Sequence, residues 1–449
     1  MFQVKNARLA DGSLATIVIK EQAIVRVETQ SGLEKVGAGA LSLDDFEGFA
    51  QAEVAGCVDA AGESLLPGLI DVHVHSRDPG DPAKETWDTL AQAAFQGGVV
   101  ALCDMPNTRP PTLDRDAIVD KAQRARLSGL DFKLYLGVTT DNISQIADLL
   151  GDPSLPLCGL KVYYGKSTGG HVFSDLGALA EALRARPQVL IAFHSEDQCM
   201  IDANESRLMD ANATFDRPAA FELHSAIRSS DAALSATRAV IEWAAATGHR
   251  IHIAHLSTPG ELALVKAAQE RGLKVTSEIT PHHLLFSTQD YARLGAFLKV
   301  NPPVRDAAEV AVLGRAFGER AIDCFATDHA PHTLEEKSRS DYHACPSGLP
   351  SIDFFAPLLF KAARHYGLSW PAAVAMASEH PARIFGFAGR GRLAPGYAAD
   401  WVWVREGSYS IEREQIRSRC GWSPYLAMPV ELEVQGTWLG GRRVFRRCG

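Results

Sequence analysis

The chain has 449 residues, of which 46% are hydrophobic and 22% are charged, a composition typical of a folded globular protein rather than a disordered one. Its formal net charge of −9 argues against a nucleic-acid partner, because phosphate backbones attract basic surfaces. The length exceeds the roughly 250 residues of a single α/β barrel, which leaves room for long loops or an accessory module.

Short β-branched runs alternate with longer alanine- and leucine-rich segments over most of the chain. Segment 261–272, ELALVKAAQERG, has the apolar spacing of an amphipathic helix ended by glycine. The alternation indicates repeated βα units and a parallel sheet, so the expected fold class is α/β, a (β/α)8 TIM barrel. The eight strands are expected at 65–75, 99–105, 132–138, 159–164, 189–196, 250–257, 274–280 and 321–330.

The two ends of the chain depart from this alternation. Residues 1–57 and 390–449 carry short strands separated by glycines, and we expect them to pair into one small β-sandwich module, which leaves 58–389 as the barrel. The sequence has no signal-peptide pattern, no run of eighteen apolar residues and no CxxC pair among its eight cysteines. We therefore expect a cytoplasmic protein with reduced thiols and no membrane partner.

A histidine pair closes the first predicted strand. Side chains alternate along a strand, so His73 and His75 point the same way and can chelate one cation at the barrel mouth. On its own, such a pair is equally well explained by chance. Two further histidines favour a metal site over a chance pair, because His194 and His255 end the fifth and sixth strands and could hold a second cation.

Two charged residues complete this set. Asp328 follows the eighth strand, where a carboxylate could bind the first metal and act as the general base toward an attacking water, although it could also be structural. Lys161 lies in the apolar strand GLKVYY, where an unpaired ammonium is costly. If carbon dioxide adds to its neutral amine, the resulting carbamate could bridge two cations.

The phrases LPGLIDVHVHSRDPG, MPNTRP, GLKVYYGKSTG, AFHSED, IAHLST, NPPVR and DCFATDHAPHTLEEK occur in this order along the chain. Together they closely resemble the dihydroorotases of the amidohydrolase superfamily, over essentially the whole length. The resemblance implies two zinc ions, with His73, His75 and Asp328 on the first and His194 and His255 on the second. Carboxylated Lys161 would bridge them, although in part of the family a loop aspartate does so, and Asp175 lies in that stretch.

The resemblance also implies how the substrate is held. Arg77, Asn107 and His332 match positions that bind the carboxylate of dihydroorotate, and Asn301 matches a position that binds its ring. The loop 344–348, ACPSG, would contact the ring through backbone groups, with glycine permitting close approach. His282 and His283 are expected to support or pack against the site rather than to bind metal.

The implied function is dihydroorotase, which closes N-carbamoyl-L-aspartate reversibly to L-dihydroorotate in pyrimidine biosynthesis. Ring opening would proceed by attack of a metal-bridging hydroxide on the ring amide, with Asp328 carrying the proton. The alternatives are another cyclic amidase, an allantoinase or hydantoinase, and a catalytically silent subunit of aspartate transcarbamoylase. Metal identity and oligomeric state stay open; a homodimer is the commonest closed assembly, and association with aspartate transcarbamoylase is a further alternative.

Overall fold

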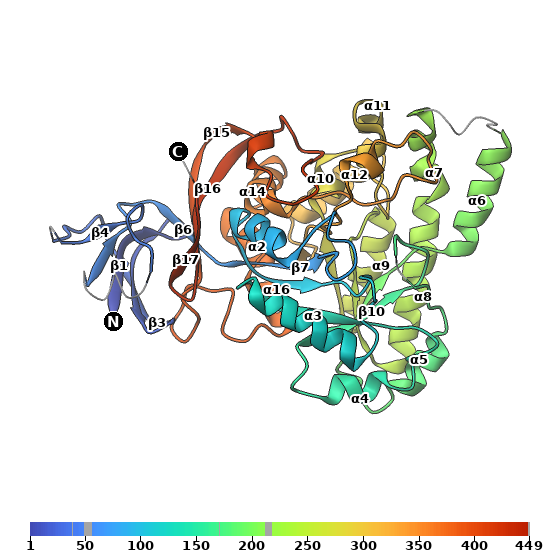
Figure 1. Ribbon diagram of the computed structural model, residues 1–449, viewed down its shortest axis with the longest axis horizontal. Helices are drawn as coiled ribbons and strands as arrows, with labels where there is room; N and C mark the ends of the chain where they lie inside the picture. The colour runs from blue at the N-terminus through green and yellow to red at the C-terminus, as the bar shows by residue number, and fades with distance from the viewer. Residues whose placement is uncertain (38, 49–55, 170, 212–217, 448–449) are drawn as a thin grey trace.

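The computed structural model describes residues 1–37, 39–48, 56–169, 171–211 and 218–447 (Figure 1). Its barrel strands are Leu69–Val74 (β7), Val99–Asp104 (β8), Asp131–Gly137 (β9), Leu157–Tyr163 (β10), Leu190–His194 (β11), Arg250–Ile253 (β12), Val275–Ile279 (β13) and Cys324–Phe325 (β14). They form one sheet in the order β14-β13-β12-β11-β10-β9-β8-β7 with parallel pairing throughout. A bridge between Val74 and His329 joins its two edges, so the predicted barrel is confirmed.

Helices follow the barrel strands, as the alternation predicted. The segment expected to be helical at 261–272 is the helix Pro259–Glu270 (α9), which Thr258 caps in a reciprocal pair of hydrogen bonds with Glu261. The other helices are Trp87–Gln96 (α2), Arg115–Leu127 (α3), Ile146–Gly151 (α4), Leu176–Ala182 (α5), Gln198–Ala211 (α6), His224–Ile227 (α7), Ser230–Thr247 (α8), Pro281–Leu285 (α10), Tyr291–Leu294 (α11), Ala307–Gly318 (α12), Leu334–Lys337 (α13), Phe355–His365 (α14), Trp370–Met376 (α15) and Glu379–Phe385 (α16).

A second, nine-stranded sheet contains strands from both ends of the chain, and Figure 1 shows it to the left of the barrel. Its strands are Phe2–Arg8 (β1), Leu14–Lys20 (β2), Ala23–Gln30 (β3), Leu41–Ser42 (β4), Cys57–Asp59 (β5), Ser64–Pro67 (β6), Trp401–Ser410 (β15), Pro429–Leu439 (β16) and Arg442–Arg446 (β17). The N-terminal and C-terminal parts meet where β6 pairs with β15. Phe46, Trp401 and Trp438 stack in its core, with ring centroids 5.5–6.1 Å apart.

The first predicted strand, 65–75, is two strands in the structure, so that expectation was wrong in detail. β6 belongs to the terminal sheet and β7 to the barrel, and Gly68 lies between them. A Cβ at Gly68 would lie 2.5 Å from a methyl carbon of Val100, so only glycine lets the chain pass so close to the barrel wall. The terminal sheet accordingly continues past residue 57, since β5 and β6 both belong to it.

Apolar side chains from the barrel strands and the chain end fill the interior away from the predicted ligands. Ile70, Val72, Cys103, Tyr135 and Phe385 are among the members of this cluster, all of them buried. A filled interior leaves the mouth at the carboxyl ends of the strands for a site. The described cysteines are free, and Cys448 lies outside the described residues. Among the described helices, none has the length and apolarity needed to cross a bilayer.

Candidate functional site

All six predicted metal ligands line one cavity of about 340 Å³ at the mouth of the barrel. Their order in the chain follows the strands: His73 comes from β7, His75 from just beyond its end, Lys161 from β10, His194 from the end of β11, His255 from just beyond β12 and Asp328 from beyond β14. The cavity is lined by His73, His75, Arg77, Asn107, Lys161, Tyr163, Ser167, Thr168, His194, His255, Val300, Asn301, Asp328, Ala330, Ser347 and Gly348. Residues far apart in sequence therefore converge on a single space.

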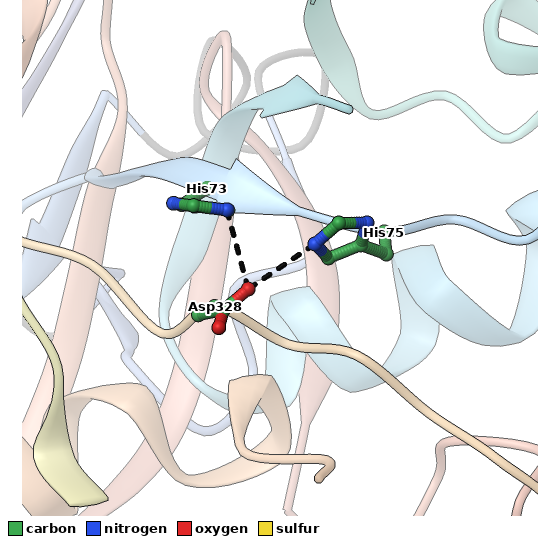
Figure 2. A group of neighbouring side chains, drawn as sticks. All are labelled: His73, His75 and Asp328. Atoms are coloured by element: carbon green, nitrogen blue, oxygen red, sulfur yellow. Dashed lines mark hydrogen bonds and ion pairs between the residues drawn. The ribbon is translucent and has the colours of Figure 1, made fainter. Parts of the chain in front are cut away.

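Three of these residues form a group with metal-binding geometry. Figure 2 shows His73 and His75 pointing from one strand toward Asp328. The Nε2 atoms of His73 and His75 lie 3.2 and 3.1 Å from Oδ1 of Asp328. Ligand atoms about 2.0–2.2 Å from a cation lie about this far apart, so the three side chains could hold one divalent ion.

The orientation of each imidazole is set by a hydrogen bond on its other nitrogen. Nδ1 of His73 contacts the carboxylate of Glu278, and Nδ1 of His75 lies 2.6 Å from Oδ1 of Asn107. Glu278 also lies 3.0 Å from Nε2 of His252 and accepts a 3.0 Å hydrogen bond from the backbone N–H of His255. With Nδ1 as the donor, Nε2 keeps a lone pair that faces Asp328, as metal binding requires.

A second pair of imidazoles, His194 and His255, lines the same cavity. Nδ1 of His194 is 2.9 Å from Nε2 of His255, and Nε2 of His194 is 2.9 Å from the carboxylate of Glu196. Arg228 pairs with that carboxylate. Burial lowers the pKa of His194 and lowers that of His255 well below its ordinary value, so both rings are neutral ligands near pH 7. The two facing nitrogens are spaced to share a second cation.

Lys161 lines the same cavity as these two groups. The side chain is 1% exposed, and Nζ has no hydrogen-bond partner among the described residues. Burial lowers the pKa of the amine to about 8, which makes the neutral form accessible near physiological pH. A neutral amine without a hydrogen-bond partner, in the same cavity as the five other predicted metal ligands, fits the predicted carbamate. Asp175, the alternative bridge, is exposed and caps α5 instead, so it lies away from the cavity.

Arg77 brings a positive charge into the same cavity. Its side chain is 5% exposed, its Nε donates to the carbonyl of Pro331 at 3.1 Å, and no carboxylate of the described residues lies within ion-pair distance. Burial lowers the pKa of its guanidinium, yet arginine remains charged near neutral pH. The charges of Asp328, Asp81 and Asp104 act on Arg77 only from a distance, so a buried guanidinium without a carboxylate in direct contact favours an anionic ligand.

Asn107 and His332, two other predicted substrate contacts, already have hydrogen-bond partners within the protein. Asn107 lines the cavity, but its Oδ1 faces His75 and its Nδ2 donates to the Thr168 carbonyl at 2.8 Å. His332 is fully buried behind the wall, with Nε2 3.1 Å from the carbonyl of Ser347 and 3.3 Å from Nη2 of Arg77. His332 is therefore placed to orient Arg77 rather than to reach into the cavity.

Asn301 and the loop before residue 349 form the opposite wall. Asn301 lines the cavity, and its Oδ1 is buried without a hydrogen-bond partner in the described structure, so it is free to accept from a ligand. Gly348 has a φ of +139°, and a Cβ there would lie 2.6 Å from the carbonyl of Ala330. Within 344–348, Ser347 and Gly348 reach the cavity, which agrees with the expected close approach of this loop.

Backbone strain is concentrated at this site. Arg77, His255 and Asp328 have φ values of +59°, +35° and +48°, although none is glycine. They are three of the eight such residues in the described parts of the chain. Left-handed conformations cost energy and persist where the surroundings enforce them, most often at functional sites. The strain supports the assignment of these residues to a working site.

Sequence reasoning missed Glu278, Glu196 and Tyr163. Tyr163 follows Lys161 by two residues on β10 and so shares its face, a periodicity that could have identified it. The glutamates carry no comparable signal. His282 and His283 are buried outside the cavity; Nδ1 of His283 lies 2.8 Å from the hydroxyl of Thr280, in keeping with a packing or support role.

Comparison with known proteins supports one family. The model of the amidohydrolase family matches residues 64–444. A dihydroorotase of Methanosarcina mazei is 34% identical over 82% of this chain and 81% of its own, and one of Halobacterium salinarum is 36% identical over 85% and 87%. An allantoinase of Rubrobacter xylanophilus is 31% identical over 96% and 94%.

The fold comparison agrees. The solved structure of an L-hydantoinase from Arthrobacter aurescens superimposes with a TM-score of 0.88 and 26% identity, covering 100% of this chain and 97% of the other. The family match, the curated relatives and the buried histidine and carboxylate ligands at the mouth of the barrel point in the same direction. The chain therefore belongs to the amidohydrolase family and is a hydrolase.

Proposed function

We propose that this protein is a dihydroorotase, which interconverts N-carbamoyl-L-aspartate and L-dihydroorotate for pyrimidine synthesis. The observation that carries the proposal is Arg77, a buried cation without a carboxylate partner in the described structure, in the cavity that holds the metal-ligand set. Dihydroorotate is a cyclic amide with a carboxylate on its ring, so it supplies both the amide and the missing counterion.

The ligand set suits two divalent cations, with His73, His75 and Asp328 on one and His194 and His255 on the other. Zinc is the metal to test first, because imidazole and carboxylate ligands suit it. Addition of carbon dioxide to the neutral amine of Lys161 would form a nitrogen–carbon bond, release a proton and yield an anionic bridge. The bound cations would polarise the ring carbonyl and lower the pKa of the attacking water.

The chain's own residues account for binding and proton transfer. Arg77 binds the substrate carboxylate, which orients the ring, and the free Oδ1 of Asn301 accepts from a ring N–H. Asp328 accepts a proton from the attacking water and delivers it to the ring nitrogen as the carbon–nitrogen bond breaks. Burial raises the pKa of this carboxyl group, which brings it closer to the range of an effective proton carrier.

A second candidate is an allantoinase or hydantoinase, which the allantoinase relative and the L-hydantoinase structure favour. Such substrates lack the ring carboxylate and would leave Arg77 uncompensated. A silent subunit of aspartate transcarbamoylase is less well supported, because a silent site has no need to keep six ligands on one cavity.

The test is ring opening of L-dihydroorotate by purified, zinc-loaded protein, followed by the ultraviolet absorbance of the ring, with hydantoin and allantoin in parallel. Arg77→Met should lower kcat/KM for dihydroorotate by roughly 10–100-fold, the value of a lost charge-assisted hydrogen bond. Arg109→Met is the matched control, because the Arg109 side chain is 74% exposed. Turnover of hydantoin or allantoin, but not of dihydroorotate, would overturn the proposal.

A further inference from the structure

Tyr163 is the one polar residue of the cavity wall on β10 besides Lys161 that no assigned role explains. It follows Lys161 by two residues, so both side chains point into the barrel mouth. The side chain is 4% exposed, and its hydroxyl has no hydrogen-bond partner among the described residues. A buried hydroxyl without a partner is costly, so its presence in a ligand cavity calls for a ligand atom that accepts from it.

The neighbours of the Tyr163 side chain indicate which ligand atom its hydroxyl can bind. Nζ of Lys161 lies 5.3 Å from the centroid of the Tyr163 ring, and the ring of His194 lies 6.2 Å from it, so the ring stands against the metal-ligand wall. Tyr163 and Arg77 line the same cavity, so one bound ligand can contact both side chains. The hydroxyl therefore shares this space with a guanidinium that has no carboxylate partner in the described part of the chain.

Electrostatics decide how such a hydroxyl can act. A phenol has an ordinary pKa of about 10, so near neutral pH the Tyr163 hydroxyl is a neutral hydrogen-bond donor. Placed beside a cation, a neutral O–H donor complements a carboxylate, whose two oxygens can accept from both groups at once.

We propose that the Tyr163 hydroxyl and the Arg77 guanidinium together bind the carboxylate of the substrate, which makes Tyr163 a residue that determines specificity for carboxylated cyclic amides. The inference rests on the proposed dihydroorotase function and deepens it. Asn107, whose side-chain oxygen faces His75, and His332, which lies behind the wall, already have partners within the protein, whereas the Tyr163 hydroxyl has none among the described residues and shares the cavity with Arg77.

The variant Tyr163→Phe removes one oxygen atom and keeps the ring. Its control is Tyr164→Phe, since Tyr164 is the next residue, lies just beyond β10, does not line the cavity and is only partly buried. With zinc-loaded protein and L-dihydroorotate, we expect Tyr163→Phe to raise KM by roughly 10-fold and to change kcat by less than about threefold, the pattern of a lost ground-state hydrogen bond to an anion. Tyr164→Phe should match the wild type.

A second arm uses the Arg77→Met background. If both groups bind the same carboxylate, Tyr163→Phe should have a smaller effect on KM there than in the wild type, because the effects of coupled residues do not add. Wild-type activity with an unchanged KM in Tyr163→Phe would overturn this inference and leave the dihydroorotase proposal intact. A fall in kcat at constant KM would also overturn it, because the hydroxyl would then act on the reacting carbonyl. An inactive wild type would overturn the function itself.

Discussion

Glu278 offers the sharpest test of how the first metal site is built. This fully buried carboxylate contacts Nδ1 of His73, lies 3.0 Å from Nε2 of His252 and accepts a hydrogen bond from the backbone N–H of His255. It therefore contacts one candidate ligand of each proposed metal site, the ring of His73 and the backbone of His255. Changing Glu278 to Gln keeps the volume, removes the charge and leaves one oxygen to serve contacts that two oxygens serve now.

Loss of such a supporting group costs about 10–100-fold in metal affinity, which corresponds to about 1.4–2.7 kcal/mol. We expect Glu278→Gln to bind zinc more weakly by this factor, measured by competition with a chromophoric chelator, and to regain activity when zinc is added in excess. The control is Glu261→Gln, because Glu261 is similarly buried but serves as the capping partner of α9. Wild-type zinc affinity in Glu278→Gln would refute the argument.

Three further predictions concern other parts of the molecule. Lys161→Ala should lose at least one metal equivalent per chain by elemental analysis, whereas Lys166→Ala, whose side chain is 68% exposed in the wild type, should not. Lys337 is fully buried, and burial lowers the pKa of its amine to about 7. In the unfolded state the lysine pKa is about 10.4, so between pH 7 and pH 10.4 the unfolded state binds more protons than the folded state. The free energy of unfolding therefore rises with pH over this range. In Lys337→Met the rise between pH 7 and pH 10 should shrink by about 3 kcal/mol in urea titrations, and an unchanged rise would contradict the prediction. Trp438 is buried in the core of the terminal sheet, so Trp438→Ala should lower the free energy of unfolding by about 3–5 kcal/mol. Because Trp438 does not line the cavity, kcat should be nearly unchanged below the melting transition.

Some parts of the site followed from local sequence alone. Strand alternation predicted that His73 and His75 share a face, and the barrel rule predicted that ligands at the ends of different strands meet at one mouth. The structure brings all six to one cavity.

Other features depend on partners that local sequence cannot reveal. Glu278 and His73 are 205 residues apart, and no spacing rule connects them. Asn107 and His332 carry the residue types expected of substrate contacts, yet their hydrogen bonds point to His75 and to Ser347. A side chain's type limits which bonds it can make, while the packing around it decides which of them form.

The sequence by itself determined the barrel, the terminal module and the six candidate ligands that the structure brings to one cavity, because hydrophobic periodicity and strand-end chemistry are local properties. Only the tertiary structure decided where strand 65–75 divides, since the close contact of Gly68 with Val100 forms when two sheets meet. It likewise decided that Arg77 has no carboxylate partner among the described residues and that Tyr163 points an unpaired hydroxyl into the same cavity. Charge compensation and hydrogen-bond satisfaction are properties of neighbours in space, so they become visible only once the chain has folded.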